Sequence, residues 1–553
     1  MQNPIDVAWN PGVSRLMVAD GDPINRVFFY EVKSNGTVNL DNNKTLGTAG
    51  GIYAGTRGLV DPNGLKFNGI SGIGADSTGN VYVSTIGWDA NVPNPSGVGA
   101  GTMLQKFNTS KTLQWNRYGL EFVDCADADP DNPTQVYTKD GRYEIDYTAN
   151  PGVWTHKAYT VDRVNYPEDP RLQPALPNPH LNNHTAAIYR VEGQKLMTVR
   201  GMNDNFPIAI YRFDPANPEI AVPAVLMKND KAANAGAWPP DHPTMGTWIW
   251  VDNDGDGKFN AEPVDDEYSI GPLLPTSYAW SLDEHGNIWY GGEIADGPDT
   301  IYRFGMSSLN ASGVPQYSMS NFQTFTNPSD IDTMERVHYI SATDTMYLSG
   351  YTPTYPKGPG DPGADWGGLG TVLYRYDNWT PPGAPDERWD GPLLLPYVHN
   401  GTGPAGMPEV HAMDMAVEGD YVFVAMNIPP RLPGSFYTSE IRVYRTFDGS
   451  YQGTLQPTPE VGDYLSFVDT RGAIRAHYVA AQGIYVVFIE DDLQAKVQMY
   501  KFDPGLRPED APGTTTAGLS YQYFQTDSLH SWKSIPAFAS MTPTASGGTC
   551  QRV

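Results

Sequence analysis

One short segment of the chain, which reads DNDGDGKFN, has the residue types of a cation-binding loop. Its carboxylates stand at alternate positions, as Asp252, Asp254 and Asp256. Side chains with this spacing can converge when a loop folds around a cation. The carbonyl oxygen of Lys258 and the side chain of Asn260 can complete a shell of oxygen atoms, which is the donor set that Ca²⁺ prefers. The segment therefore predicts a calcium site.

This segment differs from an EF-hand at the position of the last ligand. The twelfth residue is Pro263, where an EF-hand has a bidentate Glu. Glu262, Asp265 or Asp266 could supply a late ligand instead. Gly257 permits the sharp turn that such a loop needs. The alternative interpretation is an acidic turn that is solvated and holds no ion.

A second set of candidate metal ligands comes from three hairpins in the C-terminal half of the chain. When these hairpins are aligned on their second strands, His338, Asp414 and His477 fall at equivalent positions. Two imidazoles and a carboxylate would suit Zn²⁺ or another transition metal. The alternative is ordinary packing, in which such polar side chains satisfy one another through water. The sequence leaves both interpretations open.

Other reactive residues do not form a recognisable site. His180 and His184 have the i, i+4 spacing of a helical metal pair, but Pro179 argues against a helix there. The chain contains no GxSxG motif. Its two cysteines, Cys125 and Cys550, exclude a zinc or iron–sulfur site built from cysteines. In an oxidising compartment they could form a disulfide that ties the C-terminal tail to the fold.

The elements that would position these residues are short strands in a repeated pattern. A two-stranded hairpin is followed by a third strand of the type AIYRFD (Ala209–Asp214) or TIYRFG (Thr300–Gly305). Such runs alternate with period two and are rich in residues that strands favour. The unit occurs eight times, with hairpins at Asp6–Asp20, Gly72–Ser84, Phe122–Thr138, Ala186–Val199, Ala279–Gly292, Val337–Gly350, Met413–Met426 and His477–Glu490.

We therefore predict an all-β fold, an eight-bladed β-propeller with four antiparallel strands in each blade. Seven blades is the alternative, if the first and last units share strands in closing the ring. One propeller domain would cover residues 1–525, and residues 526–553 would form a C-terminal tail. In such a ring the two histidines and Asp414 would lie on inner strands along the axis. The calcium loop would lie on the outer edge of the fourth blade.

The hairpins also resemble a known group of proteins. Segments such as GIGADSTGNVYVS and AWSLDEHGNIWYGG, each followed by a strand of the x-Y-R-F type, resemble NHL-repeat propellers. They are similar to the wider six-bladed group that includes SMP-30-type lactonases and the peptide-amidating lyase. The resemblance covers about residues 5–525 and implies the fold. Because those relatives have fewer blades than the eight units counted here, it transfers no catalytic residue by position.

Composition excludes two classes of partner. The net charge is −27, from 63 acidic and 36 basic residues, which argues against a nucleic-acid partner. The chain has no apolar run of about 18 residues, so no membrane span is expected. Sequons of the N-x-S/T type permit a secreted glycoprotein. They begin at Asn35, Asn43, Asn108, Asn183, Asn310, Asn378 and Asn400.

These observations lead to one function and two alternatives. We expect a secreted, extracellular or periplasmic propeller that is stabilised by calcium and acts as a binding or scaffold module. Its partner would be an extracellular protein or a carbohydrate, on which Trp366 and Trp379 could stack if exposed. The alternative is a metal-dependent lactonase, lyase or hydrolase with its site in the central channel. A quinoprotein dehydrogenase is disfavoured because no regular Trp-docking repeat occurs.

Overall fold

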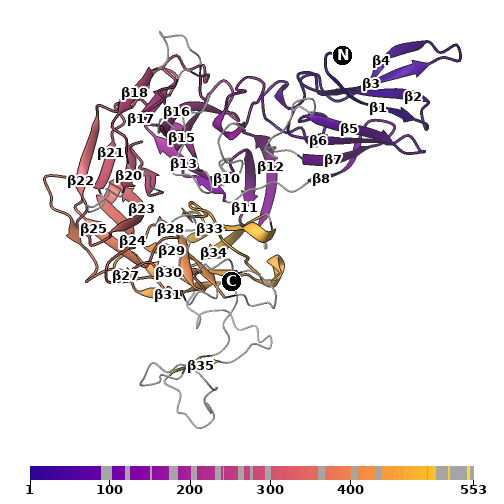
Figure 1. The fold of residues 1–553 in the computed structure, drawn as a ribbon. Coiled ribbons are helices and arrows are strands. Elements are labelled where there is room, and N and C mark those ends of the chain that lie inside the picture. Colours follow the sequence, from indigo (N-terminus) through magenta and orange to yellow (C-terminus); the bar gives the residue numbers. More distant parts are fainter. Residues whose placement is uncertain are drawn as a thin grey trace.

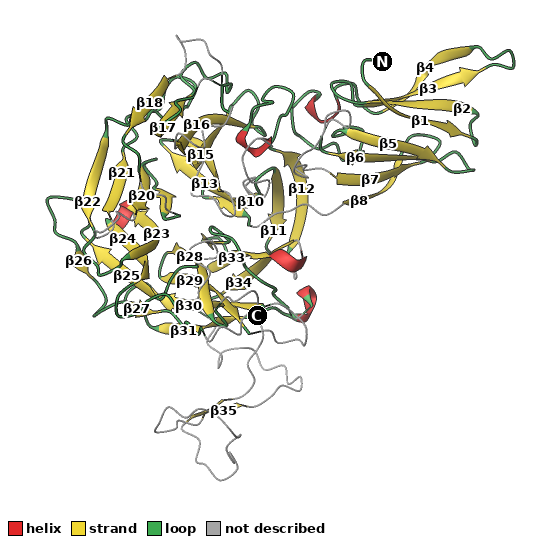
Figure 2. Cartoon of the chain, viewed as in Figure 1, coloured by secondary structure: helices red, strands yellow, loops and turns green. Residues whose placement is uncertain are grey.

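The computed structural model describes most of the chain outside its C-terminal segment. The described residues are 1–88, 102–118, 125–149, 152–172, 185–200, 208–230, 238–240, 242–259, 267–274, 278–292, 300–358, 368–399, 408–429, 437–462, 464–494, 496–505, 521–523 and 545–547. The regular secondary structure among them is almost entirely β-strand, joined by turns and loops (Figure 2). Five 3₁₀ turns occur among them: Gly51–Tyr53, Pro170–Leu172, Ser341–Thr343, Pro459–Val461 and Asp492–Gln494. None of the described helices is long and apolar enough to cross a membrane.

Two antiparallel sheets form the N-terminal part of the chain. Sheet 1 contains β1 (Pro4–Asn10), β2 (Arg15–Asp20), β3 (Arg26–Val32) and β4 (Val38–Leu46). Sheet 2 contains β5 (Ile70–Ala75), β6 (Val81–Ile86), β7 (Thr102–Phe107) and β8 (Leu113–Tyr118).

Three further sheets follow in the middle of the chain. Sheet 3 contains β9 (Asp127–Asp129), β10 (Asn132–Tyr137), β11 (Gly141–Asp146) and β12 (Val153–Tyr159). Sheet 4 contains β13 (Thr185–Val191), β14 (Gln194–Arg200), β15 (Ile208–Phe213), β16 (Ala221–Asp230), β17 (Gly246–Val251) and β18 (Glu267–Gly271). Sheet 5 contains β19 (Trp280–Leu282), β20 (Ile288–Gly292), β21 (Thr300–Phe304) and β22 (Phe322–Thr326).

Sheets 6 to 8 complete the series. Sheet 6 contains β23 (Thr333–Ile340), β24 (Thr345–Tyr351), β25 (Val372–Asp377), β26 (Asp386–Glu387) and β27 (Leu393–Leu394). Sheet 7 contains β28 (His411–Glu418), β29 (Tyr421–Ile428), β30 (Thr438–Arg445) and β31 (Tyr451–Leu455). Sheet 8 contains β32 (Ile474–Val479), β33 (Ile484–Asp491) and β34 (Lys496–Phe502). A separate pair joins β35 (Tyr521–Tyr523) to β36 (Ala545–Gly547).

The predicted all-β class and the eight antiparallel sheets are confirmed. Within the described residues, five of the eight sheets have four strands, while sheets 4, 6 and 8 have six, five and three. Each sheet begins with a hairpin that the sequence pattern placed correctly. For example, β23 pairs with β24 from Thr333 opposite Tyr351 to Ile340 opposite Thr345.

The packing between sheets shows how they are arranged. Apolar clusters join sheets 3 and 4, 4 and 5, 5 and 6, 6 and 7, and 7 and 8. A further cluster joins sheet 8 back to sheet 3, through residues such as Ala128 and Phe488. Six sheets therefore close into a ring of contacts. Sheets 1 and 2 pack on each other through a separate core and extend to one side of this ring (Figure 1).

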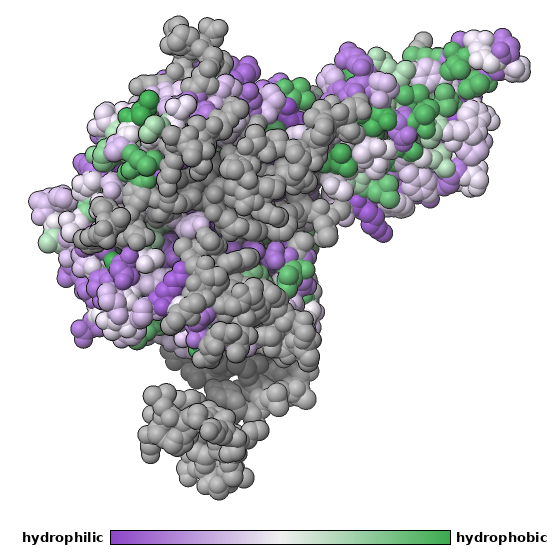
Figure 3. Space-filling model, viewed as in Figure 1, coloured by the Kyte–Doolittle hydropathy of each residue, from purple (hydrophilic) through white to green (hydrophobic). Residues whose placement is uncertain are grey.

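Burial along the strands agrees with this division. In sheets 6 and 7, β24 is buried at every position and β29 at all but its last, because neighbouring sheets cover both faces. In sheet 2, β6 alternates between buried and half-buried residues, as expected for a strand with one covered face. Exposed apolar side chains gather over sheets 1 and 2, and they include Val7 and Trp9 (Figure 3).

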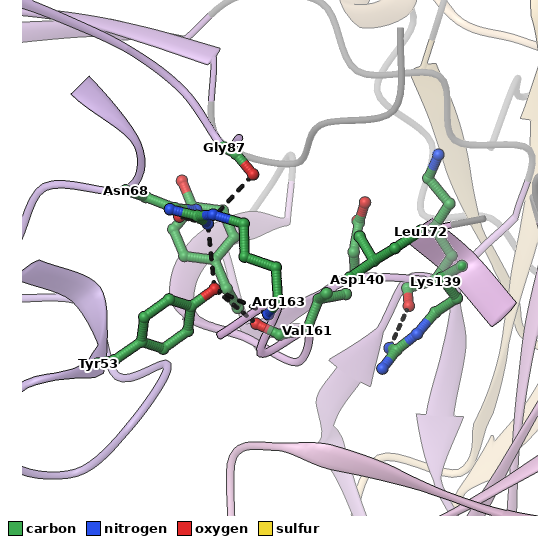
Figure 4. A pocket seen from close by; sticks show the side chains of 10 residues that line it. Tyr53, Asn68, Gly87, Lys139, Asp140, Val161, Arg163 and Leu172 are labelled. Atoms are coloured by element: carbon green, nitrogen blue, oxygen red, sulfur yellow. Dashed lines mark hydrogen bonds between the residues drawn. The ribbon is translucent and has the colours of Figure 1, made fainter. Parts of the chain in front are cut away.

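One buried arginine connects the N-terminal pair of sheets to the ring. Arg163, in the segment after β12, donates two hydrogen bonds to Asp22, at 2.7 and 2.9 Å. The same side chain donates to the Asn68 side chain at 2.6 Å and to the Gly87 carbonyl at 3.1 Å. Tyr53 lies beside it, with its hydroxyl 3.0 Å from Arg163 (Figure 4).

Candidate functional site

The predicted calcium loop follows β17 in the outer part of sheet 4. Carboxylate oxygens of Asp252, Asp254 and Asp256 lie within 4.8 Å of one another. Asp252 is buried, Asp254 is exposed and Asp256 is half-buried. The arrangement gives a group of hard oxygen donors that opens toward solvent, which is the chemistry that Ca²⁺ prefers. Asn260, the predicted last ligand, lies outside the described residues.

The backbone of the loop is shaped by its own carboxylates. The amide of Gly255 donates to Asp252 Oδ1 at 3.1 Å, and the amide of Asp256 donates to Asp254 Oδ1 at 2.9 Å. The amide of Lys258 donates to Asp256 Oδ1 at 2.8 Å. Such bonds hold the loop in a tight coil.

Contacts with residues of sheet 4 hold the loop in place. Arg212, in β15, donates from Nη2 to the carbonyl oxygen of Gly255 at 2.5 Å, and its Nε lies 4.0 Å from Asp252 Oδ2. Gly257 has a φ of +72°, and a Cβ at this position would lie 2.4 Å from Val222 Cγ1. A larger residue there would therefore displace the side chain of Val222, in β16. Lys258 contributes its ammonium group, which lies 3.1 Å from Asp256 Oδ2.

A cavity of about 280 Å³ lies where the inner strands of the ring meet. The first strand of each of the six ring sheets contributes to its lining, and β14 contributes two residues more. Its polar lining consists mainly of Asp127, Thr185, Arg200, Ser281, Glu284, Arg336, His338, Glu418, Arg475 and His477. This axial cavity is the second candidate site.

The axial cavity contains both predicted histidines. Their strands, β23 and β32, are each followed by a four-residue turn, since Ile340 pairs with Thr345 and Val479 pairs with Ile484. His338 and His477 therefore occupy the same level of the ring, as the alignment predicts.

Asp414 occupies a different level. The turn of its hairpin has only two residues, because Glu418 pairs with Tyr421. Asp414 lies four residues before Glu418, whereas each histidine lies two residues before the last paired residue of its strand. Asp414 is therefore two positions further from the turn than the histidines are. It forms an ion pair with Arg336 and accepts a hydrogen bond from the amide of Ile474 at 3.3 Å. The donor atoms of Asp414 and the two histidines do not converge to metal-binding distances. The structure thus does not assemble the predicted channel set.

The two histidines have different electrostatic surroundings. Burial lowers the pKa of His338 to about 4, and the nearby guanidinium groups of Arg336 and Arg475 act in the same direction. Burial also lowers the pKa of His477, but the carboxylate of Asp127, which contacts its Nε2, outweighs this and raises the pKa above 6.5. His338 is therefore neutral near pH 7.

Arginines, not metal ligands, dominate the deeper end of the axial cavity. Arg200, Arg336 and Arg475 line it, and the charges of Arg471 and Arg475 lower the pKa of Arg200 and of Arg336. The signal in the sequence that could have found two of these arginines is a repeated R-x-H pattern, which places Arg336 two residues before His338 and Arg475 two residues before His477.

A second group of carboxylates was not expected from the sequence. Asp469, Glu490 and Asp492 bring oxygens within 4.8 Å of one another at the edge of sheet 8. The amide of Asp469 donates to Glu490 Oε2 at 3.0 Å. Burial raises the pKa of Asp492 to about 6, and the charges of Asp469 and Asp491 add to this. These residues are not regularly spaced in the sequence, so no motif predicts the group.

The remaining candidates give mixed outcomes. Cys125 is buried between sheets 3 and 8, while Cys550 lies outside the described residues, so their pairing stays a prediction. His180, His184 and Trp366 also lie outside them. Trp379 is only 1% exposed and packs between sheets 5 and 6, so the expectation that it stacks on a sugar is wrong.

Comparison with known proteins shows similarity at the level of structure alone. No protein-family model matches the chain, and no curated protein matches it. A putative 6-phosphogluconolactonase from Bacteroides uniformis is 10% identical with a TM-score of 0.29, covering 77% of this chain and 96% of its own. A putative 6-phosphogluconolactonase from Bacteroides fragilis is 12% identical with a TM-score of 0.28, covering 77% of this chain and 95% of its own.

Hydrazine synthase from Kuenenia stuttgartiensis is 9% identical with a TM-score of 0.24, covering 91% of this chain and 96% of its own. Identities and scores this low carry no argument about the family or the activity of this chain, so the resemblance to NHL-repeat and SMP-30-type propellers stays a prediction.

Proposed function

We propose that this protein is a calcium-stabilised β-propeller that acts as a binding module, with its ligand held in the axial cavity. An extracellular setting belongs to the same proposal, since millimolar calcium would keep the loop occupied there. The observation that carries the proposal is the convergence of Asp252, Asp254 and Asp256. A cavity that receives residues from every sheet of the ring gives the module a place to bind its ligand.

Repulsion among the loop carboxylates is the physical reason to expect a cation. Three like charges within 4.8 Å disfavour one another, and the Lys258 ammonium at Asp256 offsets only part of this. Calcium binding to the folded chain alone would add stability by mass action. At a hundredfold excess over Kd this amounts to about 2.7 kcal/mol. Because the loop lies on sheet 4 outside the axial cavity, its ion would be structural.

Thermal melting with and without calcium tests the proposal. EDTA should lower the melting temperature of the wild type, and excess Ca²⁺ should restore it. Asp256→Ala should melt at a low temperature in both conditions. Asp448→Ala is the matched control, because Asp448 also accepts from a backbone amide two residues on, at 3.0 Å, in an exposed turn. This control should respond to EDTA as the wild type does.

The opposite pattern would overturn the calcium assignment. If the wild type and Asp256→Ala melt alike with and without EDTA, the loop is only an acidic turn. Mg²⁺ at equal concentration should stabilise less than Ca²⁺, because Mg²⁺ requires near-ideal octahedral geometry and gives up its water reluctantly.

A further inference from the structure

The arginines in and near the deeper end of the axial cavity differ in whether an acid lies beside them. Arg336 forms an ion pair with Asp414, and Arg471 Nη2 lies 2.9 Å from Glu335 Oε2. Arg475 Nε lies 3.9 Å from Asp127 Oδ2, and that carboxylate already contacts His477. Each of these three arginines therefore has an acid as a partner, although the third pair is loose.

Arg200 has no such partner among the residues that the structure describes. It is 7% exposed, and its guanidinium donates to the carbonyl oxygens of Tyr278 at 3.0 Å and Trp280 at 2.5 Å. Its Cζ lies 4.2 Å from the ring centroid of Trp280. Carbonyl groups and an aromatic face solvate the cation but do not neutralise its charge.

The consequence is a positive region inside an otherwise acidic protein. Burial lowers the pKa of Arg200 to about 9, and the charges of Arg475 and Arg471 lower it further. Burial likewise lowers the pKa of Arg336, with Arg200 as the next cause. Removing a charge from water without a counter-ion is costly, so such a cluster is poised to accept an anion.

Two hydrogen-bond donors on the cavity wall also favour an anion. Within the described part of the chain, Arg475 Nε and Ser281 Oγ are buried and have no hydrogen-bond partner. Both residues line the axial cavity with Arg200 and Arg336. Three acids line it as well. Asp127 contacts His477, whereas Glu284 and Glu418 belong to the turn end of the inner strands, where Glu284 accepts from Ser341.

We propose that the deeper end of the axial cavity binds a small organic anion, whose carboxylate or phosphate group lies among Arg200, Arg336 and Arg475. Guanidinium groups bind both kinds of anion through paired hydrogen bonds, so the two share one recognition chemistry. A volume of about 280 Å³ admits a small metabolite but no polymer. This inference rests on the proposed binding function and names the ligand class of its site.

Calorimetric titration of the calcium-loaded full-length chain tests the inference. Inorganic phosphate and malonate are the probes, in a chloride buffer without other oxyanions. We expect saturable binding of at least one probe, which would show whether the site prefers phosphate or carboxylate. Arg200→Met and Arg475→Gln should each weaken that binding by about tenfold or more. Arg442→Gln should leave it unchanged, because Arg442 pairs with Glu440 in β30, outside the cavity lining.

Calcium-dependent melting of each variant shows whether it has folded. Arg475 is partly exposed to the cavity, so Arg475→Gln decides the matter if Arg200→Met does not fold. Undiminished binding in the variants that fold would place the anion elsewhere and overturn the inference. Absence of binding by the wild type would also overturn it, even where calcium stabilises the chain as proposed.

Discussion

The imidazole of His477, in β32, contacts the carboxylate of Asp127, in β9, although 350 positions separate them in the sequence. Around this contact, the last sheet packs on the third sheet, with Cys125 Sγ 4.0 Å from the carbonyl oxygen of Phe488. The ring therefore closes without the first two sheets. Its closure combines an apolar joint with several polar contacts, which include those of His477 with Asp127 and of Lys501 with the carbonyl oxygens of Tyr147 and Ala149.

This closure predicts that the ring folds without its N-terminal extension. A chain that lacks residues 1–118 should retain a cooperative melting transition and its response to calcium, because every apolar joint of the ring remains. Removing residues 466–553 instead should abolish the transition, because it exposes the joints on both sides of sheet 8. Circular dichroism and calorimetry of both truncations provide the test. An N-terminal truncation that fails to melt cooperatively would show that sheets 1 and 2 are part of the ring.

Attachment of the N-terminal sheets should depend on Arg163. Replacing it by Ala leaves Asp22 without its two charged hydrogen bonds and removes the bonds to Asn68 and Gly87. Breaking a buried pair in this way typically costs about 3 to 5 kcal/mol. We expect faster proteolysis of the segment between β4 and β5 while the calcium-dependent transition of the ring persists. Arg117→Ala, at an exposed arginine of β8, is the control and should behave as the wild type.

The sequence could predict the hairpins of the eight sheets but not which sheets pack together to close the ring. The eight hairpins were predictable because each short segment contains alternating apolar and polar residues and the residues of a tight turn. The choice of neighbour was not, because closure depends on apolar faces that look alike in every unit. Sheet 8 could join sheet 1 or sheet 3, and only the packing of Ala128 against residues such as Phe488 decides between them.

The candidate sites show the same contrast. The calcium loop is one continuous segment, so its spacing alone brought Asp252, Asp254 and Asp256 together. The axial cavity collects residues from six sheets, and there a turn shorter by two residues moved Asp414 from the level of the histidines to that of Arg336. Turn length cannot be read reliably from an isolated segment, so the grouping of Arg200, Arg336 and Arg475 appeared only in three dimensions.

Gly257, in the calcium loop, and Gly193, outside it, offer a matched pair of alanine variants. Gly257 and Gly193 both have a positive φ, +72° and +84°, so Ala costs about 1 kcal/mol of backbone strain at either site. At Gly193 a Cβ meets no atom within 4 Å, whereas at Gly257 it would lie 2.4 Å from Val222 Cγ1. Gly257→Ala should therefore destabilise the chain more than Gly193→Ala and should weaken calcium binding. Equal melting temperatures and equal calcium affinities in the two variants would contradict the loop geometry.

Protonation of His338 should destabilise the folded chain as the pH falls. Its pKa is about 4 in the folded chain, against 6.5 when unfolded, because burial and the charges of Arg336 and Arg475 disfavour the imidazolium while Glu284 opposes them only in part. The unfolded chain therefore binds a proton between these values and the folded chain does not. The stability that His338 contributes is present above pH 6.5 and is lost as the pH falls to 4, with an upper limit of about 3 kcal/mol.

The substitution His338→Gln removes the titrating group. It should therefore reduce the dependence of the free energy of unfolding on pH below 6.5. Urea unfolding between pH 4 and 7.5 should show that His338→Gln gains stability relative to the wild type as the pH falls. His285→Gln, at an exposed histidine, should keep the pH dependence of the wild type. The assignment fails if His338→Gln and the wild type lose stability in parallel, because His338 would then reach solvent and titrate alike in both states.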